Sequence, residues 1–200
     1  ERSRGITIFS KQARLETASR AVTLVDTPGH VDFSAEAERT LSILDCAVLV
    51  ISGTDGVQAH TLTLWRLLER YSVPTFLFIN KMDLPVTEKE KLLADLQSRL
   101  SAGCIDFGGS GEEIQEACAM TDEALLESFL ETGEVTSGNI RGLISGRKVF
   151  PCCFGSALKN KGVAELLNIL DTYAPEKTYP ADFAARVYKI TRDPQGARLT

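Results

Sequence analysis

The sequence lacks several features that mark particular classes of protein. No apolar run approaches the roughly 18 residues that a membrane-spanning helix needs, so we expect a soluble, cytoplasmic protein with no membrane partner. Positive charge is not in excess, because 22 Lys and Arg stand against 27 Asp and Glu, for a net charge of -5. Nonspecific attraction to a polyanion is therefore weak. We expect no DNA partner, although a local patch could still meet RNA.

The cysteine content indicates neither a metal site nor a disulfide framework. The chain has five cysteines, an odd number, and their spacing matches no metal-ligand pattern. They are Cys46, Cys104, Cys118, Cys152 and Cys153. Three of them lie in or beside apolar runs, which favours buried free thiols.

Four short, continuous apolar runs predict interior strands of a mostly parallel sheet. These runs are 21–25, 47–51, 75–79 and 149–154. Helical periodicity follows each of them, at 34–44, 60–71, 87–100 and 162–173. The third helical segment opens with a capping-box pattern, Thr87-Glu88-Lys89-Glu90. The alternation is typical of a doubly wound α/β domain with helices on both faces of the sheet.

Three segments depart from this alternation. The more polar stretch Ile8–Glu16 predicts an antiparallel strand at the sheet edge. Residues 104–146 predict an insertion, with a flexible loop at 106–111 followed by two short helices. The periodicity stops after residue 175, and 183–190, followed by a turn signal, predicts the start of a separate β domain.

Polar residues follow each predicted strand where it ends. Asp26 follows the first strand, Ser52 the second, Asn80-Lys81-Met82-Asp83 the third and Gly155-Ser156-Ala157 the fourth. The carboxyl ends of parallel strands meet at one edge, outside which α/β sheets bind their ligands. We therefore expect a binding site there.

The polar groups at this edge suit a guanine nucleotide with Mg²⁺. Asp83 offers two acceptors for the guanine N1 and 2-amino donors, and Asn80 supports the loop and reaches N7. The stem of Lys81 can lie over the ring, and the backbone N–H of Ala157 would read the guanine carbonyl oxygen. Adenine has a donor where guanine has this acceptor and lacks the 2-amino group, so the site would reject ATP in favour of GTP.

Four segments resemble, in the family's order, the second to fifth guanine-nucleotide motifs of translational GTPases. They are Arg4-Gly5-Ile6-Thr7-Ile8, Asp26-Thr27-Pro28-Gly29-His30, Asn80-Lys81-Met82-Asp83 and Ser156-Ala157-Leu158. Each segment alone is also explained by an ordinary strand, cap or turn, and the order carries the resemblance. The resemblance implies a P-loop GTPase-type fold, GTP or GDP with Mg²⁺ as cofactors, and a monomer with the ribosome as its partner.

The same resemblance implies a role for each matching residue. Thr7 would be the switch threonine that meets Mg²⁺ and the γ-phosphate, and Asp26 would hold Mg²⁺ through a water. Gly29 would donate its backbone N–H to the γ-phosphate, which orders the switch loops. His30 would position the attacking water and favour the developing charge. Residues 156–158 would complete the guanine pocket.

Segments between these motifs are most similar to elongation factor G and to its relatives, the tetracycline ribosomal protection proteins. They are Val31-Asp32-Phe33-Ser34-Ala35-Glu36, Leu44-Asp45, Gly56-Val57-Gln58-Ala59 and Val149-Phe150-Pro151. An intermediate interval between Asp83 and Ser156, together with the segment 121–126, favours the tetracycline ribosomal protection branch. A general elongation factor G homologue and a peptide-release-factor GTPase stay open as alternatives.

The sequence departs from the family at its first motif, because it contains no glycine-rich phosphate loop ending in Lys-Ser or Lys-Thr. In the family that loop follows a central strand, without which the strand ending at Asp26 would have an unpaired edge. We expect 1–178 to form a GTP-binding domain that lacks this strand, and 179–200 to form a linker and the first strands of a β-barrel domain. The chain is then either part of a ribosome-stimulated GTPase, inactive alone, or a non-catalytic fragment with only a guanine pocket.

Overall fold

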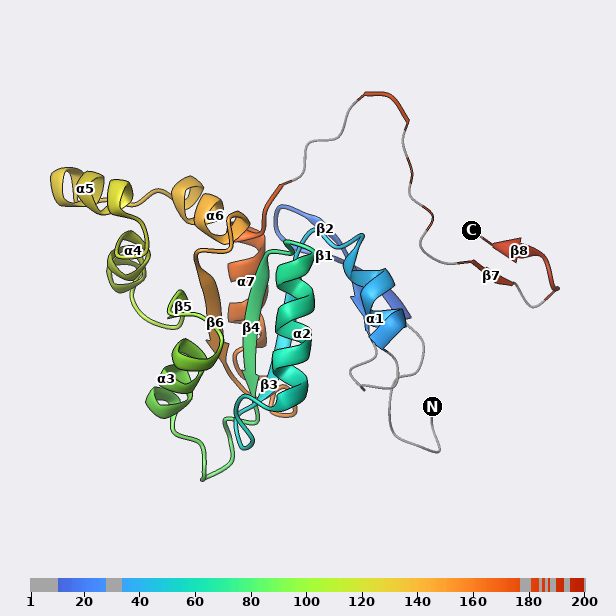
Figure 1. Ribbon diagram of the computed structural model, residues 1–200, viewed down its shortest axis with the longest axis horizontal. Helices are drawn as coiled ribbons and strands as arrows, with labels where there is room; N and C mark the ends of the chain where they lie inside the picture. The colour runs from blue at the N-terminus through green and yellow to red at the C-terminus, as the bar shows by residue number, and fades with distance from the viewer. Residues whose placement is uncertain are drawn as a thin grey trace.

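The computed structural model describes residues 11–27, 34–176, 181–183, 185, 187, 190–192 and 195–199 (Figure 1). The central elements are four parallel strands in the order β3-β4-β6-β5. Their bounds are β3 Ala47–Ser52, β4 Thr75–Asn80, β6 Phe150–Phe154 and β5 Cys104–Asp106. In this register Ser52 lies opposite Asn80, and Ile79 lies opposite Phe154. Three of the four strand ends that were expected to carry the site, those of β3, β4 and β6, therefore meet at one edge.

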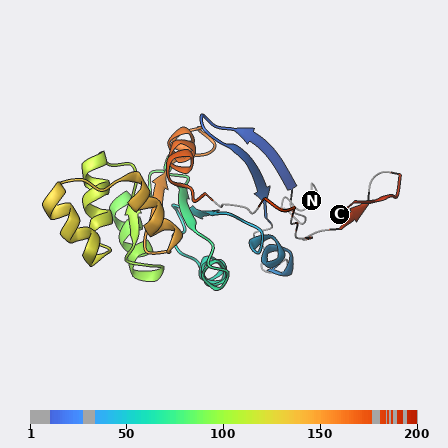
Figure 2. The ribbon, with the colours of Figure 1, turned by 90° about the horizontal axis from the view of Figure 1, so that it is seen from above.

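Alternate side chains of β4 pack into two cores, one on each face of the sheet. Leu77 and Ile79 belong to the core that includes residues of the helices α2 (Ala59–Arg70) and α3 (Lys89–Arg99). Phe76 belongs to the core formed with α4 (Gly111–Ala119), α6 (Ser137–Ser145) and α7 (Val163–Tyr173). All three side chains are fully buried. The result is an α/β fold in which helices flank a parallel four-stranded sheet, consistent with a P-loop GTPase domain, and it confirms the predicted fold class (Figure 2).

Four helices follow their strands as predicted; three are shorter than expected, and α2 is shifted by one residue. They are α1 Ser34–Leu41, α2 Ala59–Arg70, α3 Lys89–Arg99 and α7 Val163–Tyr173. The capping box predicted at Thr87 is wrong, because α3 begins after Glu88, which makes no side-chain capping bond. The Thr87 hydroxyl instead donates to the carbonyl of Leu84 at 2.8 Å, and so belongs to the preceding loop.

The strand predicted at 21–25 is present, but its predicted place inside the parallel sheet is wrong. It forms β2 (Ala21–Asp26), which pairs antiparallel with β1 (Lys11–Glu16) in a sheet of two strands, apart from the parallel sheet within the described residues. The antiparallel partner was predicted correctly, although residues 8–10 lie outside the description. Leu24 is 51% exposed because no described strand or helix covers it. An apolar run predicts a strand, but burial depends on its neighbours.

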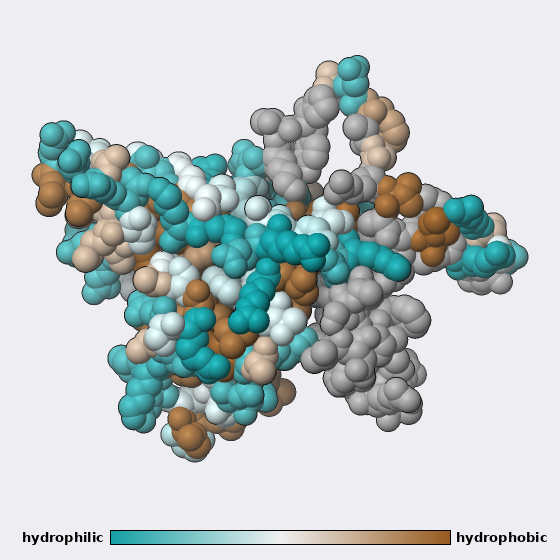
Figure 3. All heavy atoms as spheres, viewed as in Figure 1, coloured by the Kyte–Doolittle hydropathy of each residue, from teal (hydrophilic) through white to brown (hydrophobic). Residues whose placement is uncertain are grey.

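The insertion at 104–146 is more regular than predicted. It contributes the short strand β5, and three helices where two were expected: α4 Gly111–Ala119, α5 Glu123–Thr132 and α6 Ser137–Ser145. The supposedly flexible loop at 106–111 is held by a bond from the Gly108 N–H to Asp106 and by an ion pair between Asp106 and Lys89 at 2.5 Å. Helix α5 has no buried residue, and hydrophobic side chains reach the surface at this end of the molecule (Figure 3).

The C-terminal prediction is only partly covered by the structure. Residues 183, 185, 187 and 190 are described and are not in a strand, so the strand predicted at 183–190 is not seen there. Two-residue strands follow, β7 Thr191–Arg192 and β8 Arg198–Leu199, on either side of the predicted turn. The domain boundary near residue 178 stays a prediction.

The five cysteines are all free, as expected, with four buried and Cys46 half-buried. Burial raises the pKa of the Cys118 and Cys153 thiols to about 12. Among the described parts of the chain, no helix is long and apolar enough to span a bilayer.

Candidate nucleotide-binding site

The ends of β4 and β6 bring two of the predicted motifs into direct contact. The N–H of Met82 donates to the carbonyl of Gly155 at 3.0 Å, and the N–H of Gly155 donates to the carbonyl of Ile79 at 2.9 Å. These bonds extend the pairing of the two strands beyond their ends. The loops Asn80–Asp83 and Ser156–Leu158 therefore lie side by side, although more than seventy positions separate them in the chain.

Asn80 links three loops at this edge. Its side-chain oxygen accepts from the N–H of Lys81 at 2.8 Å and from the N–H of Ala157 at 2.9 Å. Its backbone carbonyl accepts from Gly53, in the loop after β3, at 2.7 Å. Lys81 has φ of +66°, a left-handed conformation that turns the chain sharply after the strand. These two bonds fix the orientation of the Asn80 amide, whose amino group could donate to a ligand.

Asp83 and Ser156 meet across the two loops. The hydroxyl of the buried Ser156 donates to the Asp83 carboxylate, and this bond is the main cause of a lowered Asp83 pKa, helped by the charges of Lys159 and Lys161. Asp83 itself is exposed. The site therefore presents an ionised, oriented carboxylate to solvent, with lone pairs left for a ligand that carries two adjacent N–H donors.

The loop after β6 folds back on itself tightly. Ser156 and Lys161 form an isolated antiparallel bridge, and Gly162 has φ of +77°. A Cβ atom on Gly155 would lie 2.3 Å from the Lys161 carbonyl oxygen, so only glycine fits. Leu158, at the tip of this loop, is 89% exposed, and its contribution to the pocket stays a prediction.

Of the remaining predicted residues, only Asp26 is described, and it lies apart from this cluster. Asp26 is the exposed last residue of β2, in the separate hairpin. Thr7, Gly29 and His30 lie outside the described residues. Within the described ranges no group of three or more His, Cys, Asp or Glu side chains could hold a metal ion. The structure thus brings Asn80, Asp83, Ser156 and Ala157 together at one sheet edge, while their role in binding a base, like that of the phosphate and Mg²⁺ residues, stays a prediction.

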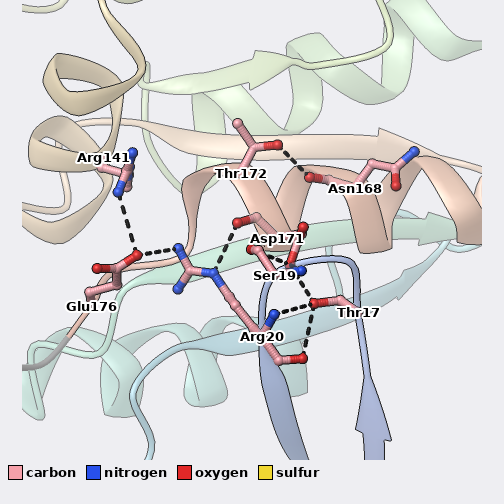
Figure 4. A network of polar contacts seen from close by, with 8 residues as sticks. All are labelled: Thr17, Ser19, Arg20, Arg141, Asn168, Asp171, Thr172 and Glu176. Carbon is pink, nitrogen blue, oxygen red and sulfur yellow. Dashed lines mark hydrogen bonds and ion pairs between the residues drawn. The ribbon is translucent and has the colours of Figure 1, made fainter.

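A polar network fixes the hairpin that carries Asp26 to helix α7 (Figure 4). Asp171 accepts from the hydroxyl and the N–H of Ser19, at 2.9 and 3.4 Å, and from the hydroxyl of Thr17. Arg20 donates to the Asp171 carbonyl at 2.9 Å and pairs with Glu176 at 3.0 Å. The sequence analysis missed these residues, because nothing in a lone Asp on a predicted helix indicates a partner about 150 positions away.

The fold of this chain is shared with known proteins. Residues 1–176 match the family model of the elongation factor Tu GTP binding domain. A crystal structure of a protein from Thermus thermophilus is similar, with a TM-score of 0.74 and 25% sequence identity. That match covers 85% of this chain and 32% of the other, so the present chain spans about a third of the Thermus protein. The chain belongs to the translational GTPase family that is defined by the elongation factor Tu GTP binding domain.

Proposed function

We propose that this domain binds GTP and GDP and hydrolyses GTP as part of a ribosome-stimulated translational GTPase of the tetracycline ribosomal protection type. Hydrolysis would release the factor from the ribosome. The observation that carries the nucleotide assignment is the joining of Asn80, Asp83, Ser156 and Ala157 at one sheet edge. The family's use of a guanine nucleotide, typically with Mg²⁺, supports it.

The described groups fit the edge of a guanine base. The Asp83 carboxylate, held by Ser156, would accept from N1 and the 2-amino group, and the free amino group of Asn80 would donate to N7. The Ala157 N–H now donates to Asn80 at 2.9 Å, so the guanine carbonyl oxygen would share this donor or displace the bond. The stem of Lys81 would cover the ring.

The phosphate side of the proposal rests on the resemblance alone. Mg²⁺, when bound, would neutralise charge between the β- and γ-phosphates. Asp26 would face it through a water and Thr7 would meet it directly. Gly29 would hold the γ-phosphate by its N–H, and His30 would orient the attacking water.

The base assignment is tested with Asp83→Asn. This change turns one acceptor into a donor, so GDP should bind more weakly and xanthosine diphosphate, which has a carbonyl where guanine has the 2-amino group, should bind more tightly. The measurement is competition of both nucleotides against a fluorescent GDP analogue. Asp122→Asn is the matched control, because Asp122 caps α5 away from this edge. An unchanged base preference for Asp83→Asn would overturn the guanine pocket.

The catalytic assignment is tested with His30→Ala in the complete protein. Hydrolysis stimulated by ribosomes should be lost while GTP affinity stays near the original value. Persisting stimulated hydrolysis would show that another group orients the water. Release of tetracycline from ribosomes by the complete protein would separate the ribosomal protection branch from a general elongation factor G or a release-factor GTPase.

The second candidate function is a guanine-binding module without catalysis, because the groups that the described residues bring together are those assigned to the base. A titration of the chain with fluorescent GDP and Mg²⁺, competed separately by GTP and ATP, distinguishes the two. Tight binding that GTP but not ATP competes supports the GTPase. Weak binding through the base alone supports the module.

A further inference from the structure

We propose that Thr87 is a positioning residue for guanine selectivity, which acts by closing the loop that carries Asp83. The inference rests on the guanine pocket proposed above. The loop runs from Lys81 to Thr87, and the side chains in its middle are exposed, Leu84 by 41% and Val86 by 79%. Thr87 is half-buried at its end, before α3 begins.

The hydroxyl and the N–H of Thr87 both bind the same carbonyl. They donate to the Leu84 oxygen at 2.8 and 3.2 Å, and the hydroxyl also lies 3.4 Å from the carbonyl of Met82. The N–H of Leu84 in turn donates to the carbonyl of Lys81 at 3.2 Å. These bonds form two consecutive turns: Lys81–Leu84, which contains Asp83, and Leu84–Thr87. The Thr87 hydroxyl is a side-chain donor to the second turn, and its contact with the Met82 carbonyl links the end of the loop to the residue before Asp83.

The methyl group of Thr87 contributes a second constraint. A Cβ atom on Gly53 would lie 3.2 Å from the Thr87 Cγ2 and 2.9 Å from the Met82 Sδ. The two side chains therefore close over the glycine of the β3 loop and leave no room there. Thr87 holds the Asp83 loop both by hydrogen bonds and by packing against a neighbouring loop.

Selectivity depends on this arrangement because a hydrogen bond to the guanine 2-amino group weakens steeply when its distance or angle is wrong. A looser loop would misplace the Asp83 carboxylate. Nucleotides with the 2-amino group would then lose binding energy, whereas inosine nucleotides, which lack that group, would lose less. The expected signature is a smaller preference for guanine over hypoxanthine.

The experiment compares GDP with inosine diphosphate for the unaltered complete protein and for Thr87→Val and Thr87→Ser, by competition against fluorescent GDP. Valine keeps the shape of threonine without its hydroxyl, so the GDP preference should fall about fivefold, the worth of roughly one hydrogen bond. Serine keeps the hydroxyl and should retain a preference within about twofold of the original. If Thr87→Val does not fold, Thr87→Ala is measured in the same way.

Thr121→Val is the matched control, because the Thr121 hydroxyl also donates to a carbonyl three residues earlier, that of Cys118, at 2.7 Å. It lies after α4, away from the pocket, and its removal should leave the preference unchanged. Unaltered protein without any preference for GDP over inosine diphosphate would overturn the proposed pocket itself. A native preference that Thr87→Val leaves intact would overturn only the role of Thr87.

Discussion

Replacing Gly155 with alanine should disturb both the stability of the domain and the guanine pocket. The new Cβ would lie 2.3 Å from the Lys161 carbonyl oxygen and 2.9 Å from Cζ of Phe78. A backbone carbonyl cannot rotate away as a flexible side chain can, so the Ser156–Lys161 turn has to move. The same turn carries Ser156 and Ala157, and a shift there displaces the partners of Asp83 and Asn80.

The size of the effect follows from the packing. Forcing an extra methyl group into a filled site costs about 1–3 kcal/mol. For a domain of this length each kcal/mol lowers the melting temperature by about 2–4 °C. Gly155→Ala should therefore melt about 2–12 °C below the original protein, as followed by circular dichroism, and should bind GDP more weakly.

Gly142→Ala provides the matched control. Gly142 is exposed inside α6, and a Cβ there would meet nothing within 4 Å. Because alanine is favoured over glycine in a helix by about 1 kcal/mol, this variant should melt slightly above the original protein. If Gly155→Ala melts at the original temperature and binds GDP as before, the tight approach of Gly155 to Lys161 does not shape the pocket.

Three more predictions concern the scaffold around the site. Arg147→Ala should lower the free energy of unfolding by about 2–4 kcal/mol, because Arg147 donates to the Val73 carbonyl and lies 5.1 Å from the Trp65 ring. An unchanged midpoint of urea denaturation would contradict this. Burial raises the pKa of Cys118 to about 12, so the folded protein holds the thiol proton more tightly than the unfolded chain. The contribution of the neutral thiol to the stability of the fold is therefore complete below about pH 9 and is lost as the pH rises toward 12. Cys118→Ala should flatten that alkaline decline in melting temperature. Asp171→Asn should speed hydrogen exchange of the β1 and β2 amides and leave β4 unchanged, and equal protection in both proteins would argue against the anchor.

Much of the residue cluster at the ends of β4 and β6 could be predicted because its signals are local. Apolar runs marked β3, β4 and β6, and polar residues marked where each strand ends. Parallel pairing then requires these ends to meet at one edge, so Asn80, Asp83 and Ser156 converge as expected. The nucleotide-binding roles of all these residues stay predictions, and three of the four phosphate-side residues also lie outside the described residues.

Other features could not be predicted because they depend on contacts between distant segments. Strand β5 has only three residues, too few for a period to show, and it is recognised only by its pairing with β6. The sequence pattern predicted Thr87 as a helix cap, yet its hydroxyl donates to the carbonyl of Leu84, in the preceding loop that carries Asp83. Both outcomes depend on what lies beside the segment in space.

The sequence by itself determined the alternation of strands and helices, and the polar groups that follow the strands, because periodicity and chain order are local properties. The tertiary structure alone decided that β2 is exposed in a separate hairpin, that Asp171 anchors this hairpin, and that Asn80 bridges to Ala157. The physical reason is that burial and hydrogen-bond partnership belong to pairs of segments. Neither is encoded at one position, and each is decided only when the chain packs.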